Sequence, residues 1–594
     1  MILRDACCLV SPIAPKLPLT GASFLAVLVL CGLFSSVTRG QEEGQNSDVV
    51  AQASSADSVD GTPTESVSDK TAVADIGLDK RIDAAFKPYA DKWEALVLTK
   101  IPLGGGKSAA IVLLLLVFGA GFFTLAFGFV NVRLIPFAIQ VVSGKYDSVE
   151  HDERFDSKIK HVEVNEVDGD LVDTIRDESQ TGEVSHFQAL ATAVSGTVGL
   201  GNIGGVAVAI ATGGPGATFW MIICGFLGMS TKFVECTLGV KYRDIDVDGT
   251  VHGGPMYYLK KGLAELGMKP LGSVLAVIFA ILCVGASFGG GNAFQSNQAA
   301  KQIISVVNVS GGSAGALVGL VMAVLVGLVI IGGIKRIASV TEKIVPFMAI
   351  LYVGAALIII LVNIQHLGTA LMEIVNGAFT PAAGLGGVLG VIMTGFQRAA
   401  FSNEAGAGSA AIAHSAVKTR YPASEGIVAL LEPFIDTVVI CTMTAVVIVL
   451  FNFDGKFEYG NVHDSNVQIA GQTYGGVDLT SAAFDSVLPG FRYILTVAII
   501  LFAFSTMISW SYYGLQSWKF LFGRSAAADL SYKIIFCLFV IVGAGASLEA
   551  VIKFSDAMIL ALVFPNMFGL LLLFPRVREE LGRYLNATIK RNAD

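Results

Sequence analysis

Long apolar runs, separated by short polar segments, dominate the chain from residue 109 onward. Each run is roughly 20 residues long, the length that crosses the hydrocarbon core of a bilayer as a helix. The runs lie at about 109–131, 187–211, 216–240, 272–297, 313–332, 341–363, 386–412, 425–451, 488–514, 532–549 and 556–574. This pattern predicts an all-α polytopic membrane protein with eleven transmembrane helices embedded in a lipid bilayer.

The N-terminal part has a different pattern. Residues 1–40 carry Arg4 and Lys16 before a short apolar core, which is typical of a secretory signal peptide; an uncleaved anchor is the alternative. Residues 41–108 form a predicted periplasmic extension, partly disordered because 41–74 hold almost no large apolar residues. The stretch 75–100 has helical apolar spacing and predicts an amphipathic surface helix. A charged segment, 145–185, predicts a solvated insert.

Lys and Arg predict the orientation, because they favour cytoplasmic connections. They concentrate on alternate connections, near 133–176, 241–269, 335–343, 418–420, 519–533 and the tail 575–594. The intervening connections carry Lys301, Lys456, Arg492 and Lys553. We therefore expect a bacterial inner-membrane protein whose tail is cytoplasmic and whose N-terminus lies outside after signal cleavage.

The eleven spans divide into one extra helix, 109–131, and two sets of five, 187–363 and 386–574. A five-helix unit that is repeated once must enter the membrane in opposite senses, which gives an inverted repeat. The first helices of the two units, 187–211 and 386–412, are also those most interrupted by Gly and polar residues. Interrupted helices at matching positions of two halves point to a transport site.

The composition and the absence of several motifs in the sequence argue against several classes of function. The chain is 53% apolar and 15% charged with a net charge of −8, which argues against a nucleic-acid partner. The motif 199–204, GLGNIG, matches G-x-G-x-x-G, but a nucleotide fingerprint needs a preceding strand and a nearby acidic residue, and both are missing. The sequence has no Walker A motif, no disulfide or zinc spacing and no catalytic constellation. We expect no enzyme activity, no nucleotide and no cofactor.

The first interrupted helix groups Gly199 and Gly201 with the polar residues Thr197 and Asn202 near its middle. Each Gly costs a helix up to about 1 kcal/mol relative to Ala, so the group predicts an unwound turn. Such a turn frees backbone N–H and C=O groups that lipid cannot satisfy but that an ion and a zwitterion can. Close packing through small residues is the alternative explanation.

The second interrupted helix, 386–412, contains Arg398 and Glu404, which lie in an apolar span and therefore need partners or water. Structural pairing is the simplest interpretation, with Glu432 and Asp436 on the next helix as partners for Arg398. Phe401 could wall a small pocket. Small polar residues at 402–408 again suggest a broken backbone.

Two further groups of polar residues lie in apolar spans. Ser505, Thr506 and Ser509 either bond back to their own helix or supply oxygen ligands for Na⁺, and Trp510 is one turn away from Thr506. Gln295 lies at the outer end of the 272–297 run. It is either a ligand contact or a polar cap at the membrane interface.

Four motifs together resemble the alanine or glycine:cation symporters. They are GTVGLGNIGGVAVAIATGGPGATFWM, GGPMYYL, FSNEAGAGSAAIAH and STMISWSYYG, within a similarity that covers roughly 109–575. The resemblance implies a leucine-transporter-type 5+5 inverted repeat, Na⁺ as coupling ion, and alanine or glycine as substrate. It also implies a sodium site formed by the carbonyls of Ser195 and Val198 with Ser505 and Thr506.

The resemblance places the substrate carboxylate on free N–H groups near Gly199 and Gly201. It extends the pocket to Thr197, Asn202, Gln295, Phe401, Thr506 and Trp510. We therefore predict a sodium-coupled symporter that imports a small neutral amino acid by alternating access. A proton-coupled carrier stays open because of Glu404, and a channel or receptor for small ligands is a further alternative.

Overall fold

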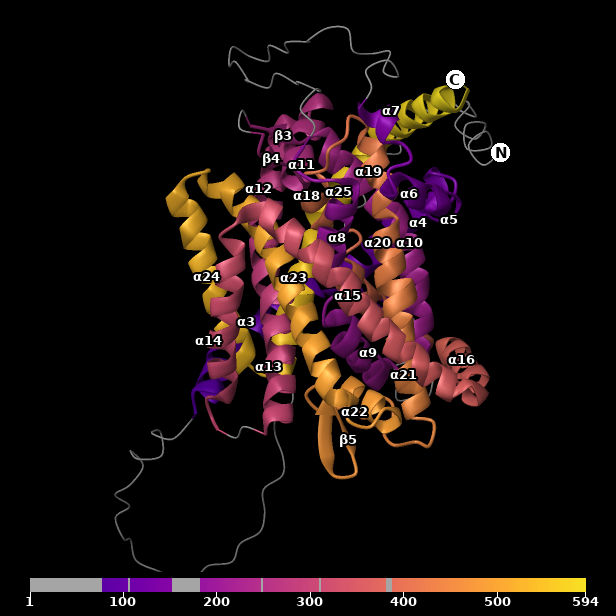
Figure 1. Ribbon diagram of the computed structural model, residues 1–594, viewed down its shortest axis with the longest axis vertical. Helices are drawn as coiled ribbons and strands as arrows, with labels where there is room; N and C mark the ends of the chain where they lie inside the picture. Colours follow the sequence, from indigo (N-terminus) through magenta and orange to yellow (C-terminus); the bar gives the residue numbers. More distant parts are fainter. Residues whose placement is uncertain are drawn as a thin grey trace, which may run out of the picture. The chain divides into compact units, whose positions relative to one another are not determined.

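The computed structural model describes residues 77–104, 107–151, 182–246, 249–308, 311–380 and 387–593. The predicted signal peptide, residues 41–76 of the extension and residues 152–181 of the insert lie outside the described residues. The described part is predominantly helical, as predicted (Figure 1). Its strands form three antiparallel two-stranded sheets: β1–β2 (Lys100–Gly104, Lys107–Ala110), β3–β4 (Asp244–Ile245, Val251–His252) and β5–β6 (Asn466–Ile469, Gln472–Gly475).

Seven helical stretches of the described chain are long and apolar enough to cross a membrane, or eight with one bent pair. The seven are α10 (Gly216–Lys241), α12–α13 (Lys269–Val307), α15 (Gly333–Val362), α19–α21 (Pro422–Phe451), α23 (Phe491–Phe522), α24 (Ala526–Gly545) and α25 (Leu548–Ala593). The bent pair is α8 (His186–Thr197) with η2 and α9 (Gly201–Gly213). A multi-pass membrane protein is thus confirmed, while the count of eleven stays a prediction.

Four apolar or interrupted helices complete the predicted spans. α4 (Ile111–Ala126) and α14 (Ala314–Ile330) are apolar but shorter than 18 residues. α17 (Gly387–Asn403) and α18 (Ala410–His414) are separated by non-helical residues. The connecting helices are α5 (Val130–Arg133), α6 (Ile135–Val142), α7 (Asp147–His151), α11 (Pro255–Glu265), α16 (Ile364–Phe379) and α22 (Val477–Val487).

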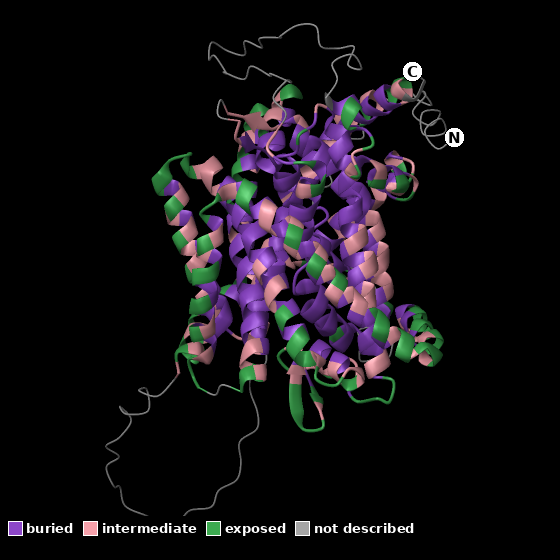
Figure 2. Ribbon diagram, in the orientation of Figure 1, coloured by how far each residue is buried: buried purple, intermediate pink, exposed green. Residues whose placement is uncertain are grey.

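Burial follows the position of each helix in the bundle. α8, α9 and α10 are almost fully buried, whereas α14, α16 and α24 carry long exposed faces (Figure 2). The exposed faces are apolar: on α14 they include Leu320, Val324 and Leu328. Exposed apolar side chains on a spanning helix are expected where the helix meets lipid rather than water. The interrupted helices therefore lie inside the bundle, where broken backbone can be satisfied.

The helix predicted over 75–100 is present as α3 (Leu78–Val97) and packs on the first turns of α25. The rings of Phe86 and Phe554 meet edge to face at 5.1 Å. Asp79 accepts the backbone N–H groups of Gly315 and Ala316, both at 3.1 Å, and thereby caps α14. The extension is therefore attached to the bundle through specific contacts.

The insert begins with a packed segment, in contrast to the predicted solvated one. Tyr146, Val149 and Glu150 are buried, because Glu150 pairs with His186 at the start of α8. At the other end of the chain, α25 continues without interruption from the last predicted span through residues 575–593. The predicted tail is thus an extension of that helix.

Candidate functional site

The first interrupted helix breaks where the sequence predicts it. α8 starts with a capping box between Ser185 and Gln188 and ends at Thr197. Val198 leaves the helical region with ψ 86°, and α9 continues at 48° to α8 after the π-helical turn η2 (Gly201–Gly205). The predicted unwound turn is therefore confirmed.

Two side-chain amides satisfy the backbone at this break. Asn202 Oδ1 accepts the N–H of Gly199, and Gln295 Oε1 accepts the N–H of Leu200, both at 2.9 Å. A Cβ added at Gly199 would lie 2.5 Å from Thr506 Oγ1. The turn thus presents N–H donors to an oxygen acceptor, the arrangement that suits a carboxylate.

The second interrupted helix breaks between α17 and α18. Glu404, Gly406 and Gly408 all have positive φ, at 55°, 93° and 81°. This conformation is strained for Glu404 and accessible to glycine, so the two glycines permit the turn. Glu404 is held in its turn by Trp510, whose Nε1 donates to Glu404 Oε1 at 2.9 Å, and by Ser409, whose hydroxyl donates to Oε2.

The two breaks meet at a small buried cavity. Its lining residues are Gly196, Thr197, Gly201, Gly290, Gln295, Phe401, Glu404, Trp510 and Ile559. The cavity volume is about 10 Å³, which admits about one water molecule. An amino acid fits only after the surrounding helices move apart.

The structure also brings together three of the four residues of the predicted sodium site, Ser195, Ser505 and Thr506. Thr506 Oγ1 donates to the carbonyl oxygen of Ser195 at 2.9 Å, and the Ser195 hydroxyl donates to the Ser505 carbonyl at 2.8 Å. The Ser505 hydroxyl bonds back to Phe502 at 3.0 Å, as the alternative interpretation expects. Thr506 thus bonds to the last turn of α8, at a residue three positions before the break at Val198.

Gln295 is not at the membrane interface. The helix continues through η3 (Gly289–Ala293) and α13 (Phe294–Val307), so Gln295 lies within the bundle and is 3% exposed. Of the two alternatives, the interface cap does not fit, because the helix extends for ten residues beyond the apolar run that ends at 297. Asn202 also differs from expectation: its Nδ2 points to Asp436, at 2.6 Å from Oδ1, rather than into the cavity.

The intramembrane charges are paired, but not as predicted. Arg398 pairs with Asp556 on α25 at 2.7 Å, not with Glu432 or Asp436. Glu432 pairs with Lys232 at 3.0 Å. Asp556 lies on a helix distant in sequence, yet its carboxylate is the one that pairs with Arg398. Separation along the chain does not predict which carboxylate lies near Arg398 in space.

Asp436 is satisfied by uncharged donors. Besides Asn202, the hydroxyls of Ser402 and Thr437 donate to its Oδ2 at 2.9 and 2.7 Å. It lies in η5 (Phe434–Cys441), beside the break in α8–α9. Its role in the described structure is to hold Asn202, and through Asn202 the N–H of Gly199.

Four cavity-lining residues were not predicted as binding residues from the sequence: Gly196, Gly290, Glu404 and Ile559. Glu404 was expected to be a structural charge, yet the residue lines the cavity. Ile559 belongs to an apolar span in which nothing distinguishes it from its neighbours. The signal that could have pointed to Glu404 is its ionisable side chain within an apolar span.

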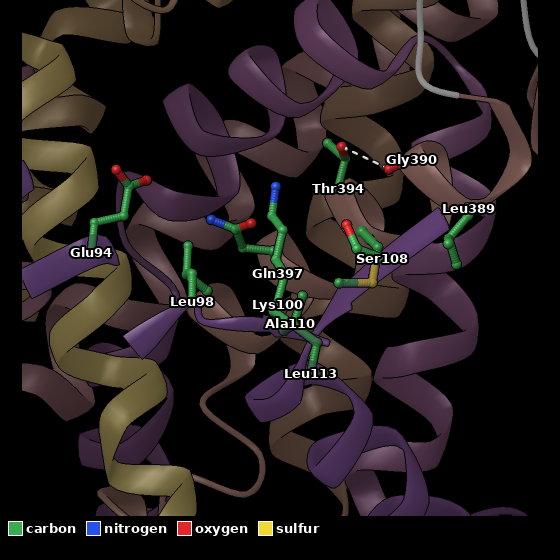
Figure 3. A pocket seen from close by; sticks show the side chains of 11 residues that line it. Glu94, Leu98, Lys100, Ser108, Ala110, Leu113, Leu389, Gly390, Thr394 and Gln397 are labelled. Atoms are coloured by element: carbon green, nitrogen blue, oxygen red, sulfur yellow. Dashed lines mark hydrogen bonds between the residues drawn. The ribbon is translucent and has the colours of Figure 1, made fainter. Parts of the chain in front are cut away.

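A larger cavity of about 500 Å³ lies between the N-terminal extension and α17 (Figure 3). Glu94 and Lys100 line it from the extension, and Thr394 and Gln397 line it from α17. Gln397 also donates to Asp556 at 2.9 Å. Burial raises the pKa of Glu94, an effect that Lys553 nearby opposes. This cavity holds none of the predicted binding residues.

The described residues contain no group of three or more His, Cys, Asp or Glu side chains arranged to hold a metal ion. Any ion at the α8–α9 break would instead rest on carbonyl and hydroxyl oxygens, which bind a monovalent cation weakly enough to release it.

The chain matches the model of the sodium:alanine symporter family over residues 155–594. It is 38% identical to the sodium/alanine symporter AgcS of Methanococcus maripaludis over 470 residues, which cover 79% of this chain and 93% of that protein. It is 36% identical to the putative sodium/proton-dependent alanine carrier protein YrbD of Bacillus subtilis, covering 68% and 81% of the two chains. A crystal structure of MhsT in complex with L-phenylalanine aligns with a TM-score of 0.44 at 15% identity, over 67% of this chain and 99% of that one.

Proposed function

Because the chain belongs to the sodium:alanine symporter family, a family of transporters, we propose that it is a sodium-coupled symporter that imports alanine or glycine by alternating access. The name of the M. maripaludis relative supports both the ion and the substrate. We place the protein in the inner membrane, with the extension outside and the end of α25 in the cytoplasm. We assign its two sets of five spans to a leucine-transporter-type inverted repeat.

One observation carries the proposal. The break between α8 and α9 sets a carbonyl–hydroxyl pair, Ser195 and Thr506, beside a cavity that two aromatic rings close, Phe401 and Trp510. Oxygen ligands suit Na⁺ and the N–H donors at Leu200 suit a carboxylate. Ion and substrate would therefore share one turn of backbone, which couples their binding.

We assign the ion site to Ser195, Val198, Ser505 and Thr506. We assign the substrate site to Thr197, Gly199, Gly201, Gln295, Phe401, Thr506 and Trp510. In this assignment the substrate carboxylate replaces Gln295 Oε1 on the N–H of Leu200. Asn202 supports the site by holding Gly199, and Glu404 faces the amino end of the substrate.

The direct test is uptake of labelled alanine and glycine by proteoliposomes. We expect accumulation against the amino-acid gradient when Na⁺ is high outside, and no accumulation when choline replaces Na⁺. Accumulation driven by a proton gradient alone would favour a proton-coupled carrier, and equilibration without accumulation would indicate a channel.

Replacing Thr506 with Ala should raise the Na⁺ concentration for half-maximal uptake. The variant removes one hydroxyl ligand, and a hydrogen-bonding group of this kind contributes about 0.5–1.5 kcal/mol, or roughly two- to tenfold in affinity. Ser511→Ala is the matched control, because Ser511 is buried on the same helix and bonds only back to Ile508. An unchanged Na⁺ dependence in Thr506→Ala would remove Thr506 from the ion site.

Replacing Ile559 with Ala should broaden the substrate range toward larger neutral amino acids. Ile559 lines the cavity, so the shorter side chain makes room for about three more carbon atoms. In an apolar pocket, a difference of this size changes the discrimination between two substrates by about 1–3 kcal/mol. The preference for alanine over valine should therefore fall about tenfold or more. Leu562→Ala is the control, a buried residue of α25 that does not line the cavity. Equal selectivity in the two variants would contradict the assignment.

A further inference from the structure

The cavity of about 500 Å³ between the N-terminal extension and α17, called the outer cavity below, has no part in the transport steps proposed above. Its volume lies within the range of small-molecule binding sites, whereas the inner cavity at the two helix breaks admits about one water molecule. One side of the outer cavity belongs to α3, β1 and β2, which precede residue 155, where the match to the family begins. The outer cavity therefore depends on a segment outside the matched region.

Contacts with α25 hold the extension in place and thereby fix its side of the outer cavity. Lys87 Nζ lies 2.6 Å from Glu549 Oε2, and Lys553 Nζ lies 2.8 Å from Asp91 Oδ1. The antiparallel pairing of β1 with β2 then sets the position of Lys100 at the start of β1.

Two opposite charges line the outer cavity, Glu94 from α3 and Lys100 from β1. In the part of the chain that the structure describes, they form no ion pair with each other. Glu94 Oε2 lies 4.0 Å from Lys553 Nζ, but Lys553 is closer to two other carboxylates, those of Asp91 and Glu549, both at 2.8 Å. The charge of Glu94 is therefore compensated only in part.

Gln397 adds an amide to these charges from the opposite side of the outer cavity. In Figure 3, the polar ends of Glu94, Gln397 and Lys100 point toward the same part of the cavity, with the amide in the middle. Gln397 Nε2 donates to Asp556 Oδ2 at 2.9 Å. Its Oε1 accepts no hydrogen bond from the described residues and is therefore available to a ligand that donates one.

The outer cavity also has an apolar wall, formed by Leu98 of the extension and by Leu389 and Met393 of α17. All three side chains are partly exposed. Covering them would remove apolar surface from water, which favours a ligand with an apolar part. Lys100 and Ser108 are exposed, so a ligand can enter from solvent at this rim.

The combination suits a zwitterion with an apolar side chain. An ammonium group fits Glu94 and the free amide oxygen of Gln397, and a carboxylate fits Lys100. A simple cation would use Glu94 alone and a simple anion would use Lys100 alone, and either would leave the apolar wall uncovered. A neutral amino acid uses all three features.

A series of contacts joins the outer cavity to the inner one. Arg398 Nη2 donates to Asp556 Oδ2 at 2.7 Å, the same oxygen that accepts from Gln397. The guanidinium of Arg398 lies over the ring of Phe401 at 4.9 Å, and Phe401 lines the inner cavity. A molecule in the outer cavity is therefore separated by these side chains from the site proposed for alanine or glycine.

We propose that the outer cavity is a second amino-acid site, which binds a neutral amino acid with an apolar side chain as a zwitterion. Lys100 binds the carboxylate, Glu94 and Gln397 Oε1 bind the ammonium group, and the side chain rests on the apolar wall. Because protein side chains compensate both charges of the ligand, binding needs no Na⁺. The choice of an amino acid over other zwitterions rests on the proposed function.

The first test is binding of labelled leucine to the purified full-length protein in Na⁺-free buffer. We expect saturable binding, and Gly201→Leu should keep it, because that substitution fills the inner cavity and leaves the outer one unchanged. Lys100→Gln and Glu94→Gln should each weaken binding about tenfold, the loss of one hydrogen bond to a charged group. Lys80→Gln, an exposed lysine of α3 that does not line the cavity, is the control and should bind leucine as the wild type does.

Leucine analogues that lack one charge assign each contact. Leucinamide lacks the carboxylate and isocaproate lacks the ammonium group, so the wild type should bind both more weakly than leucine. In Lys100→Gln, leucine should lose its advantage over leucinamide but keep its advantage over isocaproate, and Glu94→Gln should show the reverse. A structural effect of either substitution would instead weaken all three ligands alike.

The second site would be overturned by absence of saturable leucine binding, by its loss in Gly201→Leu, or by equal weakening of leucine and both analogues in the two charge variants. Alanine uptake by a protein that does not bind leucine would overturn the second site and leave the proposed function intact. Leucine binding with the expected analogue pattern, in a protein that does not accumulate alanine, would contradict the proposed function and support the second site.

Discussion

Replacing Gly201 with Leu is expected to abolish amino-acid binding while leaving a folded, membrane-inserted protein. Gly201 lines the cavity, and a Cβ at this position would already lie 3.3 Å from the ring of Phe401. The Leu side chain adds four carbon atoms where the cavity has a volume of about 10 Å³. Overpacking of this kind costs about 1–3 kcal/mol, and the substrate competes directly for the same space.

The measurement is Na⁺-dependent binding of labelled alanine to purified protein, with uptake as a second readout. Gly354→Leu is the matched control, because the same substitution on α15 meets no atom within 4 Å of its Cβ. We expect wild-type binding in the control and none in Gly201→Leu, with similar yield and size-exclusion profiles. Normal binding in Gly201→Leu would mean that the substrate does not occupy the α8–α9 break.

Replacing Arg398 with Met should strongly destabilise the protein. Arg398 and Asp556 form a buried ion pair at 2.7 Å, and removal of one partner leaves a buried charge without compensation. Breaking such a pair costs about 3–5 kcal/mol. The expected result is a clear drop in apparent melting temperature, measured as the fraction of protein that stays monodisperse after heating in detergent.

The double variant Arg398→Met with Asp556→Asn separates this effect from lost packing. It removes both charges and keeps a polar group for Gln397, which donates to Asp556 in the structure. Much of the lost stability should therefore return. Arg398 also lies over the ring of Phe401 at 4.9 Å, so a double variant as unstable as the single one would show that this packing, rather than the charge, governs stability.

Much of the fold could be predicted because it follows from free-energy penalties that act between neighbouring residues of the chain. Apolar runs of bilayer length predict spanning helices because each backbone group in lipid must be bonded within its own segment. The glycine and polar groups at 197–202 and 402–408 predict breaks because they weaken a helix wherever it lies. Both breaks occur where predicted, and the motifs around them identify the sodium:alanine symporter family, which the family comparison confirms.

Pairing across the bundle could not be predicted in the same way. Arg398 binds a carboxylate 158 positions away, and Thr506 meets the Ser195 carbonyl 311 positions away. Gln295 reaches the break because its helix continues to Val307, which places the residue inside the bundle rather than at a helix end. Ile559 lines the cavity only because of how α25 packs in the bundle, since its sequence neighbours are equally apolar.

The sequence by itself determined that the chain crosses a membrane several times, where two helices must break, and to which family the chain belongs, because these properties depend on residues close together in the chain. The tertiary structure decided which breaks share a cavity, which charges pair, and that the N-terminal extension and α17 enclose a second cavity. These depend on how helices distant in sequence pack, and the energy of a contact is set by distance in space.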